Sequence, residues 1–169
     1  MATGLQSVAW DSASSFKMLF DTTTIPATNV ATPDMEIKVE KVARLGEVLP
    51  TKRTIGRAEL SDLEVEIELS DYTQIILPRQ PRHSGTLLEF VCTCTIRHPS
   101  VLGSYGLLLD GCRIVKHPSM SFEPDEKAIR KKIGISVMAM WEKGLDGIWK
   151  ALSPMPTLPS SQAIAAMSF

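Results

Sequence analysis

The residues from Leu63 to Leu69 (LEVEIEL) alternate without a fault between aliphatic and acidic side chains. Successive side chains of a β-strand point to opposite faces, so this pattern predicts a strand with one buried and one polar face. The aliphatic residues define the buried face, and Glu64, Glu66 and Glu68 share the other. This arrangement is typical of an antiparallel sheet that covers a core on one side only.

Most of the segment 35–152 also favours β-structure. Met35–Val39 alternates apolar and polar residues, and the odd-numbered residues from Ile133 to Trp141 are apolar or small, so both segments predict strands. Leu87–Arg97 is rich in Val, Ile, Thr and Cys, as strands commonly are. Taken together, these segments predict a mainly β fold, an antiparallel β-sandwich or partial barrel with one short helix.

Turn and helix signals are sparse. Asp110-Gly111 separates two apolar runs within Leu107–Val115, and this dipeptide predicts a type I′ hairpin turn because it supplies positive φ angles. Lys143–Leu152 has helical spacing, although it contains two glycines. A second short helix or a loop is expected at Asp71–Leu77.

The two ends of the chain differ from its middle. Residues 1–34 are rich in Ser, Thr and Ala, and residues 153–169 contain three closely spaced prolines. We therefore expect an N-terminal arm (1–34), a β-domain (35–152) and a C-terminal tail (153–169). Extended arms of this composition are ordered only where something ties them down, either the same subunit or a neighbouring copy.

Charge and cysteine content exclude several classes of protein. Lys and Arg number 18 against 19 Asp and Glu, which is not the basic excess of a dedicated nucleic-acid binder. No apolar run approaches the ~20 residues that span a bilayer, and the N-terminus lacks the pattern of a signal peptide. The chain has only three cysteines, an odd and small number, which argues against a secreted protein held together by disulfides. We expect a soluble protein that is made, and used or assembled, inside a cell.

The charges are divided unevenly along the chain. Residues 1–71 hold 12 acidic and 7 basic residues, a net charge of −5, whereas residues 72–169 hold 7 acidic and 11 basic residues, a net of +4. Chance scatter explains such a division. A subunit whose acidic and basic sides meet on neighbouring copies explains it as well, and contacts of that kind generate rings and filaments.

The sequence contains none of the common catalytic or nucleotide-binding motifs, so we expect no catalytic, cofactor-binding or metal-ligating residues. Cys92, Cys94 and Cys112 fit small buried side chains better than a zinc site, because zinc ligands seldom follow C-x-C spacing along a strand. His98 and His117 each precede a proline after a predicted strand, which is typical of a turn; a pair of titrating histidines is the alternative.

Two charged segments invite a functional interpretation. The connection Ala43–Ser61 is longer than most and contains Arg44, Lys52, Arg53 and Arg57. The glutamates of Leu63–Leu69 are either simply exposed or form a surface that must not bind polyanions. A third charged segment, the basic run from Lys127 to Lys132, follows three acidic residues and is expected to be a solvated, self-compensating face.

In this order of elements the chain resembles a bacteriophage tail tube protein. The elements are a polar N-terminal arm, a strand (Met35–Val42), a long basic loop (Ala43–Ser61), the acidic strand Leu63–Leu69, a hairpin with Asp110-Gly111 and a closing strand (Ile133–Trp141). The resemblance implies a structural subunit, not an enzyme, without cofactor. Its copies would form rings, commonly hexameric, that stack into a hollow tube. It also implies that Lys52, Arg53, Ile55 and Arg57 lie in a loop that contacts the adjacent ring. Glu64, Glu66 and Glu68 are then candidates to line the lumen.

The same resemblance implies the setting. The subunit would belong to a virion tail assembled in the host cytoplasm, with sheath, baseplate or terminator proteins as partners and no insertion into a membrane. DNA would pass through the tube without specific binding, since a wall that repels phosphate lets the duplex slide. Two alternatives remain: a monomeric β-barrel that binds a ligand in an apolar interior, and an enzyme with a site around Cys112 and His117.

Overall fold

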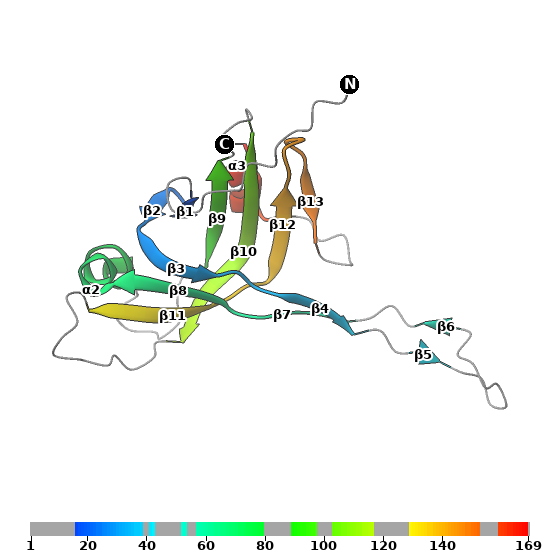
Figure 1. Ribbon diagram of the computed structural model, residues 1–169, viewed down its shortest axis with the longest axis horizontal. Helices are drawn as coiled ribbons and strands as arrows, with labels where there is room; N and C mark the ends of the chain where they lie inside the picture. The colour runs from blue at the N-terminus through cyan, green and yellow to red at the C-terminus, as the bar shows by residue number, and fades with distance from the viewer. Residues whose placement is uncertain are drawn as a thin grey trace, which may run out of the picture.

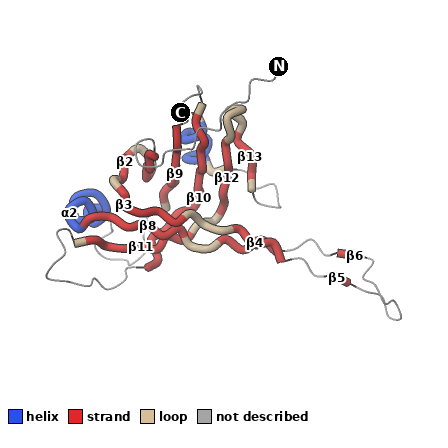
Figure 2. Tube along the Cα trace, in the orientation of Figure 1, coloured by secondary structure: helices blue, strands red, loops and turns tan. Residues whose placement is uncertain are grey.

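The computed structural model describes residues 16–38, 41–42, 52–53, 57–79, 89–97, 103–116, 129–152 and 159–168. The described part of the chain is mainly antiparallel β-structure, which confirms the predicted fold class (Figures 1 and 2). Its main sheet has nine strands and remains open, in the order β2-β1-β9-β10-β11-β8-β3, while β12 and β13 branch from β10. Within these residues no helix is long and apolar enough to cross a membrane.

The long strand β10 (Ser104–Lys116) divides the sheet into two layers. Its first half pairs with β9 (Phe90–Arg97) and β12 (Ala139–Lys143), and its second half pairs with β11 (Arg130–Ser136). β11 continues the second layer through β8 (Leu63–Glu68) to β3 (Ala27–Ala31). The strands of this layer run across those of the first (Figure 1), so the side chains facing inward from both layers enclose one core.

Residues 16–31 form three core strands rather than an arm. β1 (Phe16–Phe20) lies between β9 and β2 (Thr23–Ile25), and β3 pairs with β8. Met18 and Phe20 are almost fully buried because their side chains point between the layers, whereas Lys17 and Leu19 point to the outer face. The expected N-terminal arm could therefore include only residues before Phe16, which lie outside the described part of the chain.

The inter-layer core is built from both sheets. The predicted buried face of β8 is confirmed, since Leu63, Val65 and Ile67 are at most 1% exposed. Leu69, the fourth predicted member, starts the helical segment instead and is partly buried. The other fully buried side chains of this core are Met18, Leu109, Ile133, Ile135, Cys92 and Cys112.

The predicted hairpin turn at Asp110-Gly111 is wrong. β10 runs straight through this dipeptide, and its register against β9 shifts between Leu109 and Cys112. Gly111 does have a positive φ, +63°, but the conformation serves a β-bulge, which also uses a left-handed glycine. Local sequence predicted the backbone angle correctly, while pairing with one continuous partner strand decided that the chain would not reverse.

The single strand predicted over Ile133–Trp141 is in fact two strands, β11 and β12, in different layers. They separate at Val137 and Met138, where the Met138 amide donates to the Asp110 carbonyl (3.0 Å). Because this break lies beside the bulge of β10, β10 and the segment that joins β11 to β12 bend at the same place. The odd-numbered residues therefore face different clusters before and after the break. Ile133 and Ile135 face the inter-layer core, whereas Trp141 faces a second cluster on the opposite side of the first layer.

The helix predicted over Lys143–Leu152 is also wrong. This segment is a hairpin between β12 and β13 (Trp149–Ala151), closed by a turn in which the Gly147 amide donates to the Gly144 carbonyl (3.1 Å). The weaker expectation at Asp71–Leu77 is confirmed by α2 (Leu69–Asp71) and the helical turns η1 (Tyr72–Ile76) and η2 (Leu77–Arg79).

The main helix, α3 (Ser161–Met167), lies in the segment predicted as a tail. Ser160 caps it by accepting from the Ala163 amide (3.1 Å). The Asp110 carboxylate in turn accepts from the Ser160 amide (2.9 Å) and hydroxyl (2.7 Å). At the other end, the Trp149 ring nitrogen donates to the Met167 carbonyl (3.2 Å). α3 thereby covers part of the outer face of the first layer, over Val91, Leu108 and Trp141.

A two-stranded ribbon projects from the body. β4 (Met35–Lys38) pairs with β7 (Arg57–Leu60), and farther out β5 (Lys41–Val42) pairs with β6 (Lys52–Arg53) (Figure 1). Where described, the connection predicted as a long loop over Ala43–Ser61 is therefore part of an antiparallel ribbon. The sequence obscured this because both paired regions are short and rich in charged residues.

Candidate assembly surfaces

The acidic face of β8 is the first candidate surface. Glu64, Glu66 and Glu68 lie opposite the buried residues of the strand, as period-2 geometry predicted, and each is half-buried. The strand sits between β3 and β11, so neighbouring side chains on both sides share this outer face.

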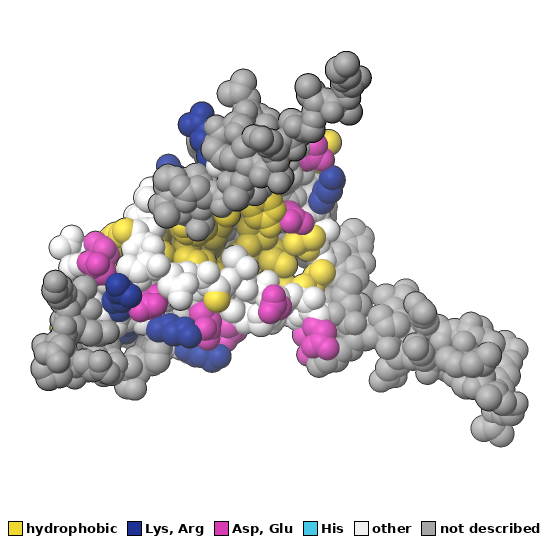
Figure 3. Space-filling view, in the orientation of Figure 1, with side chains coloured by type: hydrophobic (Ala, Val, Ile, Leu, Met, Phe, Trp, Pro, Cys, Tyr) yellow, Lys and Arg dark blue, Asp and Glu magenta, His cyan; other side chains and the backbone are white. Residues whose placement is uncertain are grey.

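The neighbours on β11 make this face mixed in charge. Lys132 forms an ion pair with Glu64 (2.5 Å), and Arg130 approaches Glu66 (3.9 Å). Lys116 of β10 adds a third pair with Asp62 (2.8 Å), which raises the lysine pKa. Figure 3 shows acidic and basic side chains interspersed over β8 and β11. The strand is purely acidic on this face, but the sheet is not.

The described basic residues of the run 127–132 contact different partners, which the sequence did not indicate. Arg130 and Lys132 face the glutamates of β8, whereas Lys131 points the other way, with its ammonium 4.0 Å from the centre of the Tyr72 ring. The acidic residues Glu123, Asp125 and Glu126, expected to compensate the run, lie outside the described residues. Cross-strand register was the missing signal, since it places Arg130 opposite Glu68 and Lys132 opposite Glu66.

The projecting ribbon is the second candidate surface. Lys52 and Arg53 form β6 and Arg57 begins β7, while Ile55 lies outside the described residues. Register places Lys41 directly opposite Arg53, and Lys38 opposite Arg57. Like charges directly opposite one another destabilise an isolated pair of strands. Register also places Glu36 opposite Glu59, so like charges of both signs stand opposite one another along the ribbon.

The three cysteines do not form a reactive site. All are free and buried, with the Cys92 and Cys94 sulfurs 4.0 Å apart. The Cys112 thiol donates to the Leu109 carbonyl (3.4 Å), and burial raises its pKa from 9.0 to about 12. The hydrogen bond to Cys94, with burial, raises the pKa of Cys92 as well. A thiol that is protonated at neutral pH is a poor nucleophile and a poor metal ligand.

The histidines and a metal site were the other chemistry that the sequence raised. His83, His98 and His117 lie outside the described residues, and within those residues no group of His, Cys, Asp and Glu could hold a metal ion. The space between the layers is filled by packed side chains of the core, whereas the ligand-binding barrel weighed above would need an apolar cavity there.

Comparison with known proteins finds solved structures with a similar fold. No family model and no curated protein matches the sequence. Among solved structures, a chain of the anti-feeding prophage baseplate is similar with a TM-score of 0.62 and 12% identity, covering 77% of this chain and 91% of that one. The two chains share one fold.

Two further structures support this assignment of fold. A chain from the sheath-tube complex of an extracellular contractile injection system matches with a TM-score of 0.59 and 11% identity, covering 82% of this chain and 89% of that one. Hcp1 from Flavobacterium johnsoniae matches with 0.53 and 11%, covering 82% and 98%. These likenesses confirm the resemblance to the tail tube family at the level of fold.

Proposed function

We propose that this protein is a structural, non-enzymatic subunit of a tail-like tube. The observation that carries the proposal is the fold match, which covers about nine-tenths or more of the neighbouring chains. In this proposal copies close into hexameric rings, and rings stack into a hollow conduit. Ring closure also gives the edge strands β2, β3 and β13 neighbours that an isolated open sheet lacks.

The ribbon supplies the contact between rings. It extends away from the core (Figure 1), and its opposed bases at Lys41 and Arg53 favour an acidic surface on the next ring. Lys52, Ile55 and Arg57 belong to the same contact. The surface of β8 that carries Glu64, Glu66 and Glu68 faces the lumen, where carboxylates keep a passing polyanion from binding tightly.

The proposed setting is the tail of a virion, assembled in the cytoplasm of the host. DNA passes through the conduit during ejection, and sheath, baseplate and terminator proteins contact the tube. The neighbours named above come from a baseplate and a sheath-tube complex, which supports partners of this kind.

Electron microscopy of the purified protein tests the proposal directly. Negatively stained preparations at high protein concentration are expected to contain rings or stacked tubes with a central channel. Light scattering after size-exclusion chromatography gives the mass of the same sample. A chain that stays monomeric at the highest attainable concentration would refute the tube and favour a ligand-binding monomer.

A further inference from the structure

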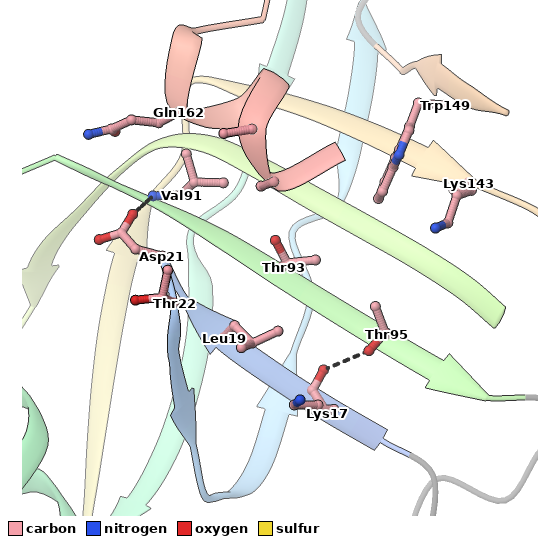
Figure 4. A pocket seen from close by; sticks show the side chains of 12 residues that line it. Lys17, Leu19, Asp21, Thr22, Val91, Thr93, Thr95, Lys143, Trp149 and Gln162 are labelled. Atoms are coloured by element: carbon pink, nitrogen blue, oxygen red, sulfur yellow. Dashed lines mark hydrogen bonds between the residues drawn. The ribbon is translucent and has the colours of Figure 1, made fainter. Parts of the chain in front are cut away.

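A half-open groove lies on the outer face of the first layer, on the side opposite the inter-layer core. Its volume is about 530 Å³, within the range of roughly 300–1,000 Å³ that small-molecule sites occupy. β1 and β9 form its floor, α3 forms one wall, and the Trp149 ring closes one side (Figure 4). Most of the lining is apolar, with Leu19 and Val91 on the floor and Ala165 on the helix wall.

One end of the groove is cationic. Strand register places Lys17 beside Thr95, Thr95 beside Gly106, and Gly106 beside Lys143. The Trp149 ring and the stem of Lys143 lie over Gly106, where a Cβ would be 3.0 Å from the ring and 3.4 Å from Cε of the lysine. Lys143 lies with its ammonium 5.0 Å from the centre of the Trp149 ring. Within the described part of the chain neither lysine forms an ion pair with a carboxylate.

The remaining polar groups of the groove are one carboxylate and the uncharged side chains of Thr22, Thr93, Thr95 and Gln162. Thr93 lines the floor and is only 9% exposed. Asp21, at the far end from Lys17 (Figure 4), already accepts from the Val91 amide (3.0 Å). The groove therefore offers two ammonium groups and a hydroxyl beside an apolar floor.

We propose that this groove binds a hydrophobic carboxylate, a molecule with an apolar body and one anionic head. The head lies at the end of the groove that Lys17 and Lys143 line. The body lies over Leu19 and Thr93, against the small side chains of Ala165 and Ala166. A charge-assisted pair in a partly dry site discriminates strongly between the anion and a neutral analogue. This inference does not depend on the tube, because it concerns a face opposite the core.

Calorimetric titration of the full chain with decanoate, below its micelle concentration, tests the site, and decanol serves as the neutral analogue. We expect one decanoate per chain, bound about tenfold more tightly than decanol, the value expected for hydrogen bonds to a charged group. The double variant K17M/K143M should lose this preference while binding decanol as before. K150M is the matched control, since Lys150 lies outside the groove and pairs with Asp146.

A second variant tests the apolar part. Ala165→Phe places a ring in the groove and should abolish binding of both ligands, and near-ultraviolet circular dichroism verifies that the variant is folded. The proposal is overturned if the folded wild-type chain shows no saturable decanoate binding, or if K17M/K143M binds decanoate like the wild type. Normal decanoate binding by Ala165→Phe would overturn it as well. If the chain binds no decanoate but the groove variants disrupt assembly, the proposal is also overturned and the groove is assigned to protein contacts.

Discussion

At the scale of single residues, Gly111 shows how tightly the corner of the fold is packed. It holds the bulge of β10 at φ +63°, and a Cβ built there would lie 2.8 Å from Cβ of Met138. Gly111→Ala is therefore expected to lower the free energy of unfolding by about 2–4 kcal/mol, through backbone strain plus overlap. Urea denaturation measures the loss.

Gly147 is the matched control for this prediction. It also has a positive φ, +74°, but a Cβ there would meet nothing within 4 Å. Gly147→Ala should therefore cost only the backbone term, about 1–2 kcal/mol. Equal losses in the two variants would show that crowding at Met138 contributes nothing.

The buried Cys112 thiol predicts a specific loss of stability in alkali. Burial raises its pKa from 9.0 to about 12, so the folded state holds its proton where the unfolded state has released it. The stability that the neutral thiol contributes is complete below pH 9 and disappears as the pH rises toward 12. Unfolding free energies measured at about pH 8 and about pH 10.5 should fall more steeply for the wild type than for Cys112→Ala.

The comparison with Cys112→Ala is needed because Tyr105 also has a raised pKa. Burial, and a hydrogen bond with Glu142, raise its pKa from 10.0 to about 12, so it adds to the alkaline loss in both proteins. Only the difference in slope reports on Cys112. Parallel slopes would contradict the assignment of a strongly raised pKa to this thiol.

At the scale of elements, α3 depends on a contact that is distant in sequence. A helix of seven residues is too short to be stable alone in water. It is held by Asp110, which receives two hydrogen bonds from Ser160. Asp110→Ala should lower stability by about 1–3 kcal/mol and speed amide hydrogen exchange in residues 161–167 more than elsewhere.

Asp146→Ala provides the comparison for α3. Its carboxylate pairs with Lys150 in an exposed hairpin, where solvent screening leaves an ion pair little effect on stability. Exchange in α3 should remain as slow as in the wild type. If Asp110→Ala also leaves α3 protected, packing on Val91 and Leu108 alone holds the helix.

The ribbon predicts an effect on assembly rather than on folding. Arg53→Glu with Arg57→Glu should weaken the stacking of rings while leaving the β-domain folded, because both residues lie on the projecting strands. The effect should be largest at low ionic strength, since charges are screened beyond about 10 Å at 0.1 M salt. Tube length in micrographs at two salt concentrations measures it.

The conservative pair Arg53→Lys with Arg57→Lys keeps the charge and should form tubes of normal length. Tubes of normal length from the charge-reversed protein would remove the ribbon from the stacking contact. A loss that salt does not change would instead indicate a packing role.

At the scale of the whole molecule, the outer face of β8 yields one prediction about folding and, if it lines the proposed lumen, one about transport. Replacing Glu64, Glu66 and Glu68 by lysine removes the partners of Lys132 and Arg130 and sets like charges across the strands. The variant should lose about 1–3 kcal/mol of stability, more than solvent exposure alone would predict. In assembled tails it should also impair DNA passage by making the wall adhesive.

The triple glutamine variant separates these two effects. It removes the charges without adding bases, so stability should change by less than about 1 kcal/mol and DNA should not be retained. Fully infectious particles with the triple lysine protein would contradict the placement of this face in the lumen. Thermal unfolding and infectivity together distinguish a folding defect from a transport defect.

Local patterns were reliable where one element decided its own structure. The alternation at Leu63–Glu68 predicted both faces of β8 because period-2 geometry needs only the strand itself. They failed where distant segments competed. Helical spacing at Leu145, Ile148 and Trp149 gave way to a hairpin, since β12 offered a pairing edge and Gly144 and Gly147 closed the turn.

The candidate surfaces show the same division. The sequence alone determined that the glutamates of β8 share a face, that the cysteines are buried and that the region of Lys52 and Arg53 is basic, because each of these follows from residue type and spacing. Only the tertiary structure decided that Arg130 and Lys132 stand beside those glutamates and that Asp110 holds α3. Both arrangements depend on strand register and on contacts between residues far apart in the chain, which local periodicity does not encode.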